Sequence, residues 1–453
     1  MPGRTVANAD RPTTGRAAFG LRTGVGIVVA NMVGSGVFLS AGYMAQDLTP
    51  YWLLLAWVVG AGLALAGART YGEIARIIGR SGGEYRYLSD LMHPWLGVLA
   101  GWASLLVGFA ASIAVDAFSA GAFLQTLIPW VDPRHVGAAL IIALTGVHAI
   151  HLGASKATQN LLVLAKVALV LGFVVIGLSL GQAAWPTWTP PTATAEIWGF
   201  PWEAFLRHQF WVAFTFSGWN AAIYAAGEFR QPQRDVPRAM LIGCAGVAML
   251  YIAVNWVFVA NLTPEQAAIV TTDEASAVTL GHLVIEDLLG PVGGMIMSGC
   301  AVVLFASALS AMTLVGPRVY AEMAEDGVLP RWLRGRPNRP PTGSVMLQGA
   351  LALGLLYVQS LRELVESAAI VLLIFSGLTA LAVFWIRFRH KDLPRPSLIG
   401  QLAAGSYLLA VVVLVGFGLQ ASWRLATTVI LIVVAATIAW WLAERKKRAA
   451  LQG

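Results

Sequence analysis

The chain has 453 residues, of which 57% are hydrophobic, and its mean hydropathy is +0.70. Charged residues make up only 12% of it, against roughly 25% in an ordinary soluble domain. This composition excludes a soluble globular domain, a disordered chain and a disulfide scaffold, and it leaves a polytopic membrane protein. The net charge of +7 then reflects basic loops at one membrane face rather than a nucleic-acid-binding surface.

Apolar segments that can cross a membrane as helices recur along the whole chain. A spanning helix needs roughly 20 apolar residues. The sequence therefore predicts an all-α polytopic membrane protein with about twelve transmembrane helices, at residues 21–47, 51–77, 95–125, 135–151, 157–181, 202–228, 238–261, 290–320, 342–359, 363–387, 398–419 and 424–443.

The basic residues orient these helices, because cytoplasmic loops carry an excess of Lys and Arg. With the N-terminus in the cytoplasm, few of the 30 basic residues are external, namely Arg134, Arg207, Arg362 and Arg424. The external loop 262–290 is acidic and has neither Lys nor Arg. The tail 1–20 lacks a cleavable signal pattern. We therefore expect a multi-pass protein of the cell (inner) membrane with both termini in the cytoplasm.

Two apolar segments contain clusters of small residues, Gly34-Ser35-Gly36 and Ser217-Gly-Trp-Asn220. A cluster of this kind marks either a helix that unwinds in mid-membrane or a close-packed helix interface. Paired interruptions in two halves of a chain point to the binding site of a transporter. An unwound helix presents N–H groups to a carboxylate and carbonyls to an ammonium, so the pair suits a zwitterion.

At these residues the chain resembles the amino acid–polyamine–organocation (APC) superfamily, in particular bacterial relatives of L-type amino-acid transporters. The resemblance covers roughly residues 20–395. Its four signatures are Val33-Gly-Ser-Gly-Val-Phe38, Ser81-Gly-Gly-Glu-Tyr-Arg-Tyr-Leu88, Phe216-Ser-Gly-Trp-Asn220 with Glu228 and Asp235-Val-Pro-Arg-Ala239, and Pro317-Arg-Val-Tyr320 with Ala324-Glu-Asp-Gly-Val-Leu-Pro330.

The resemblance implies a LeuT-type fold that works by alternating access. Its transporter core would span residues 21–390, with helices 1–5 at 21–181 and helices 6–10 at 202–387 as inverted repeats. Residues 391–453 would supply helices 11 and 12 and a basic cytoplasmic tail.

The resemblance also implies a substrate site at the two interruptions. The substrate carboxylate would meet Ser35 and the amides beside it in Gly34-Ser35-Gly36. The substrate amine would meet the carbonyls of Met32, Phe214 and Ser217. Phe214 would also be an aromatic gate, and Asn220 a polar residue near the second interruption.

Two ionisable residues lie within predicted spans. An intramembrane Lys costs about 2.5–3.5 kcal/mol on insertion scales, so Lys166 either snorkels or has buried partners. By the resemblance it takes the place of a coupling cation, ties to helix 1 carbonyls and to Ser307 and Ser310, and makes transport independent of sodium. For Asp116 two interpretations stay open: an ion pair inside the bundle, for example with Arg207, or a contact for a cationic side chain or a proton acceptor.

The leading hypothesis is a sodium-independent amino-acid transporter, either an exchanger or proton-coupled. A polyamine or cationic amino-acid carrier is the alternative, and a non-transporting sensor or a membrane enzyme ranks lower. His148 and His151 are three apart, but without further ligands they make a poor metal site. We expect no cofactor, no metal and no nucleic-acid partner. Neither Cys lies in an external loop, so we expect a monomer or homodimer without a covalent ancillary subunit.

Overall fold

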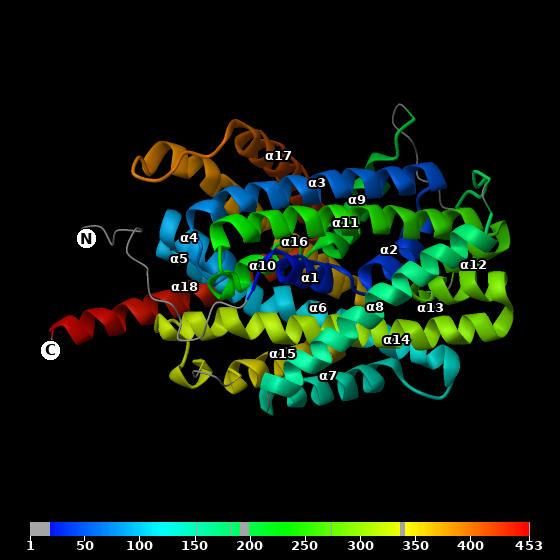
Figure 1. The fold of residues 1–453 in the computed structure, drawn as a ribbon, viewed down its shortest axis with the longest axis horizontal. Helices are drawn as coiled ribbons and strands as arrows, with labels where there is room; N and C mark the ends of the chain where they lie inside the picture. The colour runs from blue at the N-terminus through cyan, green and yellow to red at the C-terminus, as the bar shows by residue number, and fades with distance from the viewer. Residues whose placement is uncertain are drawn as a thin grey trace.

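The computed structural model describes residues 19–150, 152–182, 184–190, 199–272, 274–335 and 340–452. These residues are helical almost throughout, and the β-structure among them is one isolated bridge between Phe19 and Phe229. Figure 1 shows long helices that run side by side along the long axis of the molecule. The predicted all-α membrane fold is confirmed.

The helices follow the predicted segments closely. The first part of the chain forms α1 (Leu21–Met32), α2 (Gly36–Ala45), α3 (Pro50–Ile77), α4 (Gly83–Leu91), α5 (Pro94–Ala103), a π-helical turn (Ser104–Gly108), α6 (Phe109–Leu127), α7 (Pro133–Ile150) and α8 (Leu152–Leu180). The remainder forms α9 (Trp202–Phe216), α10 (Ala221–Tyr224), a 3₁₀ turn (Ala226–Glu228), α11 (Pro232–Asn261), α12 (Pro264–Thr272), α13 (Glu274–Val278), α14 (Leu280–Glu325), a 3₁₀ turn (Arg331–Leu333), α15 (Thr342–Val358), α16 (Leu361–Arg389), α17 (Leu398–Ala421) and α18 (Trp423–Gln452).

Nine helical stretches of the described chain are long and apolar enough to cross a membrane, counting α1–α2 and α5–α6 as one stretch each. Two shorter apolar helices, Leu164–Leu180 and Thr342–Val358, match the fifth and ninth predicted segments. The interrupted pair α9–α10 matches the sixth. The clearest difference lies in the predicted loop 262–290, which contains α12, α13 and the start of α14. Gly290, at φ 75°, interrupts α14 where the predicted span begins.

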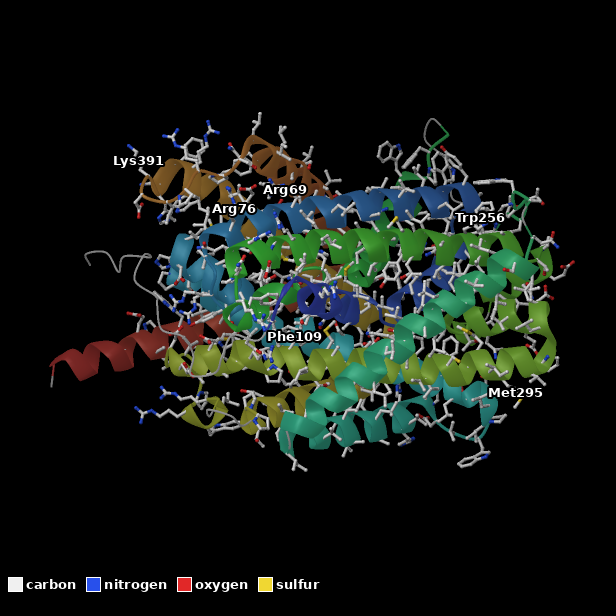
Figure 2. All side chains as sticks on the ribbon, viewed as in Figure 1. Arg69, Arg76, Phe109, Trp256, Met295 and Lys391 are labelled. Carbon is white, nitrogen blue, oxygen red and sulfur yellow. The ribbon has the colours of Figure 1, made fainter. Side chains whose placement is uncertain are left out.

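The two ends of the helix bundle differ in chemistry. Arg69, Arg76 and Lys391 lie toward one end, which we call the basic end, whereas Trp256 and Met295 lie toward the other (Figure 2). α4 and the last turns of α18 also lie at the basic end (Figure 1).

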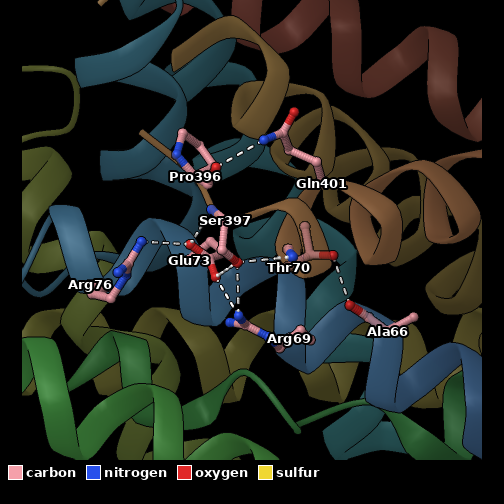
Figure 3. A network of polar contacts seen from close by, with 9 residues as sticks. Ala66, Arg69, Thr70, Glu73, Arg76, Pro396, Ser397 and Gln401 are labelled. Atoms are coloured by element: carbon pink, nitrogen blue, oxygen red, sulfur yellow. Dashed lines mark hydrogen bonds and ion pairs between the residues drawn. The ribbon is translucent and has the colours of Figure 1, made fainter. Parts of the chain in front are cut away.

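A buried carboxylate fastens α3 to the start of α17 (Figure 3). Glu73 is 1% exposed and pairs with Arg69 at 2.5 Å and with Arg76 at 2.9 Å. It also accepts hydrogen bonds from the hydroxyl of Ser397 at 2.7 Å and from its backbone N–H at 3.2 Å. A buried carboxylate needs such a complete set of partners, so Glu73 serves the fold rather than the substrate site.

Candidate functional site

The first predicted interruption is a true break in the helix. α1 ends at Met32 and α2 begins at Gly36, and Val33 between them is extended, with φ −74° and ψ 101°. Ser35 is fully buried. Since α2 begins here, the positive N-terminal end of its dipole faces the break.

The second interruption is also a break. α9 ends at Phe216 and α10 begins at Ala221. Gly218 in between has φ +97°, a conformation that favours glycine. A Cβ atom added to Gly218 would lie 2.7 Å from the carbonyl oxygen of Asn31. The second break therefore presses its backbone directly against the end of α1.

The two broken helices also pack closely along α2 and α9. A Cβ atom on Gly36 would lie 2.5 Å from Thr215 Oγ1 and 2.9 Å from Thr215 Cα. The rings of Tyr43 and Trp211 stack with centroids 4.2 Å apart. The small residues of the first cluster thus serve both predicted purposes, since Gly36 allows close packing beside a helix that is unwound.

Lys166 of α8 closes the carbonyl end of the first break. Its side chain is fully buried, and Nζ donates hydrogen bonds to the carbonyl oxygens of Ala30 and, at 2.7 Å, Val33. These carbonyls belong to the negative C-terminal end of α1. The predicted contact with helix 1 carbonyls is present.

The predicted partners of Lys166 on α14 are wrong. Ser310 Oγ forms a hydrogen bond with His148 Nε2 at 2.8 Å. Ser307 Oγ is buried and has no hydrogen-bond partner among the described residues. The unwound carbonyls of Ala30 and Val33 accept the hydrogen bonds of the lysine instead.

Asp116 of α6 closes the other side of the first break. Its carboxylate accepts hydrogen bonds from the backbone N–H of Ser35 at 3.0 Å and from the Ser35 hydroxyl at 2.5 Å. The predicted ion pair with Arg207 is wrong, because Arg207 pairs with Glu203 one turn earlier in its own helix. Asp116 lies where the resemblance places the substrate carboxylate. The signal in the sequence was a lone carboxylate in an apolar span.

Two of the predicted amine-binding carbonyls, those of Met32 and Phe214, already accept hydrogen bonds within the protein. The phenol of Tyr251 donates to the carbonyl oxygen of Met32 at 2.5 Å. The backbone N–H of Ser217 donates to the carbonyl oxygen of Phe214 at 2.9 Å, and the Phe214 side chain is buried. Sequence reasoning missed Tyr251, which nothing distinguishes from other aromatic residues of an apolar helix.

Asn220 belongs to a buried polar cluster at the second break. Its amide nitrogen donates to Glu84 Oε1 at 2.6 Å. The phenols of Tyr224 and Tyr71 donate to the same carboxylate at 2.6 and 3.1 Å. Glu84, quoted above only within a signature, thus joins α4 to the second break.

A small cavity of about 60 Å³ lies on this side of the second break. Ser217, Trp219 and Asn220 line it together with residues of α3, α9, α16 and α17, and its lining includes no residue of α1 or α2. It is therefore separate from the space between the two breaks.

Ion pairs join neighbouring elements at the basic end of the bundle. Arg86 contacts Glu322 at 2.8 Å and Asp326 at 3.3 Å, and the phenol of Tyr85 donates to Asp326 at 2.6 Å. Burial, followed by the charge of Asp326, raises the pKa of Tyr85 well above its ordinary value, so the phenol remains a donor. Arg318 pairs with Glu228 at 3.1 Å, which joins two of the quoted signatures.

The described residues hold no group of three or more His, Cys, Asp or Glu side chains suited to a metal ion. His148 contacts Ser310, whereas His151 lies outside the described residues. The weak metal hypothesis for this pair gains no support.

The sequence profile described as "Amino acid permease" matches residues 19–436. The chain belongs to the amino acid permease family. The permease is accordingly a multi-pass membrane transporter of amino acids rather than an enzyme, as the signatures predicted.

Curated relatives agree over most of their length. The permease is 26% identical over 414 residues to "Large neutral amino acids transporter small subunit 2" of Homo sapiens, covering 88% of this chain and 75% of that protein. It is 27% identical over 401 residues to "b(0,+)-type amino acid transporter 1" of Oryctolagus cuniculus, covering 86% and 80%. It is 28% identical over 379 residues to "Serine/threonine exchanger SteT" of Bacillus subtilis (strain 168), covering 82% and 84%.

Proposed function

We propose that this permease is a sodium-independent amino-acid exchanger that works by alternating access. One observation carries the proposal: the ammonium of Lys166 occupies the carbonyl end of α1. Unwound carbonyls at the end of a half-helix are where transporters of this kind coordinate a coupling cation. A resident cation on these oxygens leaves no place for sodium. The name of the serine/threonine exchanger SteT supports exchange.

The amino acid would bind between the two breaks. Its carboxylate would take the N-terminal end of α2, with Gly34, Ser35 and Gly36. Its amine would reach the carbonyls that face the space from the ends of α1 and α9. In that role the carbonyls of Met32 and Phe214 must exchange or share their present hydrogen bonds, and the carbonyl of Ser217 is the third acceptor. Phe214 would form the aromatic wall, and Asn220 would shape the far side.

A neutral substrate fits this site better than a cationic one. A carrier of polyamines or cationic amino acids needs several carboxylates in its pocket, and Asp116 is the carboxylate that reaches the first break. Glu84 is committed to Asn220 and Tyr224. The relative named for large neutral amino acids supports the same choice.

The topology follows from the basic end. We place this end in the cytoplasm of the cell (inner) membrane with both termini, and we assign residues 21–181 and 202–387 to two inverted halves. Cys244 is buried in α11 and Cys300 lies within α14. Neither is available in a loop for a disulfide, so we propose a monomer or homodimer without a covalent partner subunit.

The test is flux in proteoliposomes. Labelled neutral amino acids are supplied outside vesicles that are empty or preloaded with amino acid, with and without sodium and with an inward proton gradient. Uptake that needs internal amino acid and ignores sodium is the expected result. Strict sodium dependence would refute the role of Lys166, and uptake into empty vesicles driven by protons would replace exchange by symport. Flux of polyamines alone would favour the alternative substrate class.

A further inference from the structure

The hydrogen bonds between Asp116 and Ser35 join two separate parts of the bundle. Ser35 lies in the break between α1 and α2, whereas Asp116 belongs to α6, 81 residues further along the chain. Asp116 is 6% exposed, and Ser35 is fully buried. We propose that Asp116 is an internal ligand that occupies the carboxylate site of the substrate-free permease and latches the first broken helix to α6. This inference rests on the proposed binding of the substrate carboxylate at Ser35.

The chemistry of the two donors makes the site exclusive. Ser35 offers one backbone N–H and one hydroxyl proton, and the same oxygen of Asp116, Oδ1, accepts from both. Hydrogen bonds to an ionised acceptor are roughly twice as strong as neutral ones. Two carboxylates forced into one site repel each other. A substrate carboxylate therefore reaches Ser35 by replacing Asp116, not by binding beside it.

Charge balance makes the latch stable without substrate. Lys166 holds the carbonyl end of the break, and Asp116 holds the amide end. The two side chains also attract each other electrostatically. A buried cation without an anion nearby is strongly disfavoured. In the substrate-free site the two charges thus balance, and both donors of Ser35 have an acceptor.

The break is least buried beside Asp116. Gly34 is partly exposed, whereas its neighbours Val33 and Ser35 are buried. A Cβ atom on Gly34 would lie 3.4 Å from Asp116 Oδ1 and 3.3 Å from Ala308. The glycine therefore lies against the carboxylate, next to the point where it meets Ser35.

A latch of this kind explains exchange. Alternating access requires one group of helices to move against another around the site. In the substrate-free state the Asp116–Ser35 bonds oppose any movement of the first broken helix against α6. A bound amino acid takes over Ser35 and releases α6, so that the loaded carrier can change conformation and the empty one cannot. The latch also lowers apparent affinity, because only the unlatched fraction can bind substrate.

The experiment compares Asp116→Asn with wild type in proteoliposomes. The amide keeps the shape and one acceptor oxygen but loses the charge, so we expect the latch to weaken. The KM for amino acid should fall about tenfold if about nine-tenths of the wild-type carrier is latched. Uptake into empty vesicles, relative to preloaded ones, should rise at least severalfold. Ser119→Ala is the matched control, since this serine lies one turn further along α6 and bonds only the carbonyl oxygen of Val115.

The outcomes separate the latch from the proposed function. Unchanged KM together with strict exchange in Asp116→Asn would overturn the latch and leave the exchanger standing. Wild-type protein without exchange of any amino acid would overturn both. A test on wild-type protein guards against misfolding of the variant: an amino-acid amide, which has no carboxylate, should fail to stimulate uptake from inside the vesicle. Stimulation equal to that of the parent amino acid would also overturn the latch.

Discussion

Gly36→Ala tests whether the two broken helices must touch. Gly36 is the first residue of α2, and the added methyl group would lie 2.5 Å from Thr215 Oγ1 and 2.9 Å from Thr215 Cα. The side-chain oxygen can rotate, but the backbone Cα cannot move without displacing α9. The substitution therefore forces the first broken helix away from the second.

The magnitude follows from two opposing effects. Overpacking in a well-packed core costs about 1–3 kcal/mol. Replacing glycine by alanine within a helix returns about 0.5–1 kcal/mol. We therefore expect a net loss of up to about 2.5 kcal/mol of stability. Transport should fall much further, because the substrate site consists of the backbone that is displaced.

Thermal unfolding in detergent and uptake in proteoliposomes measure the two effects separately. Gly26→Ala is the control, since it lies in α1 with nothing within 4 Å of its added methyl group, and it should be neutral or stabilising. Gly36→Ala combined with Thr215→Ala should lose less than the sum of the single changes, because it removes one of the clashing atoms. Full transport and unchanged stability in Gly36→Ala would refute the close approach of the two helices.

Three further predictions concern the charges around the breaks. Lys166→Met should cost about 3–5 kcal/mol of stability, because it leaves a buried anion and two carbonyls without their cation; thermal unfolding measures this, and unchanged stability would contradict the contacts described. Glu84→Gln should cost about 1.5–3 kcal/mol by weakening charge-assisted bonds, and an unaltered unfolding temperature and uptake rate would show that the second break does not depend on this carboxylate. Reversing the charge of Arg318 alone or of Glu228 alone should alter uptake, whereas reversing both should restore it. The free energy of unfolding should change by no more than about 1 kcal/mol, because both side chains are partly exposed.

The sequence predicts most of the fold because membrane helices leave a strong local signal. Each of the twelve apolar segments appears as a helix or an interrupted pair. Loop 262–290 is the clearest miss, since α12 and α13 are too short and too polar to resemble spans. The two breaks were also predictable, because Gly34, Gly36 and Gly218 weaken a helix wherever they lie.

The partners of the buried charges were not predictable in the same way. Lys166 and Asp116 can be identified from the sequence, because a charged side chain in an apolar helix is costly. The groups that satisfy them are backbone atoms of α1 and the break, 133 and 81 residues away, together with the Ser35 hydroxyl. Local pattern carries no information on such distances. The resemblance predicted the carbonyl partners of Lys166, whereas the predicted side-chain partners differ from those observed: Ser310 bonds His148, and Arg207 pairs with Glu203.

An unwound helix inside a membrane must find new partners for its backbone groups, because no water is present to replace the lost hydrogen bonds. In this permease Lys166, Tyr251 and Asp116 are the hydrogen-bond partners of the first break. Each of these side chains lies where an atom of a bound ion or substrate would otherwise contact the backbone of the break. Transport then consists of exchanging internal ligands for external ones. The cation is the permanent partner in this scheme, because two carbonyls hold it and it belongs to the protein itself. The carboxylate is the replaceable partner, because every amino acid carries the same group. The direction of coupling, from substrate binding to helix movement, follows from that difference.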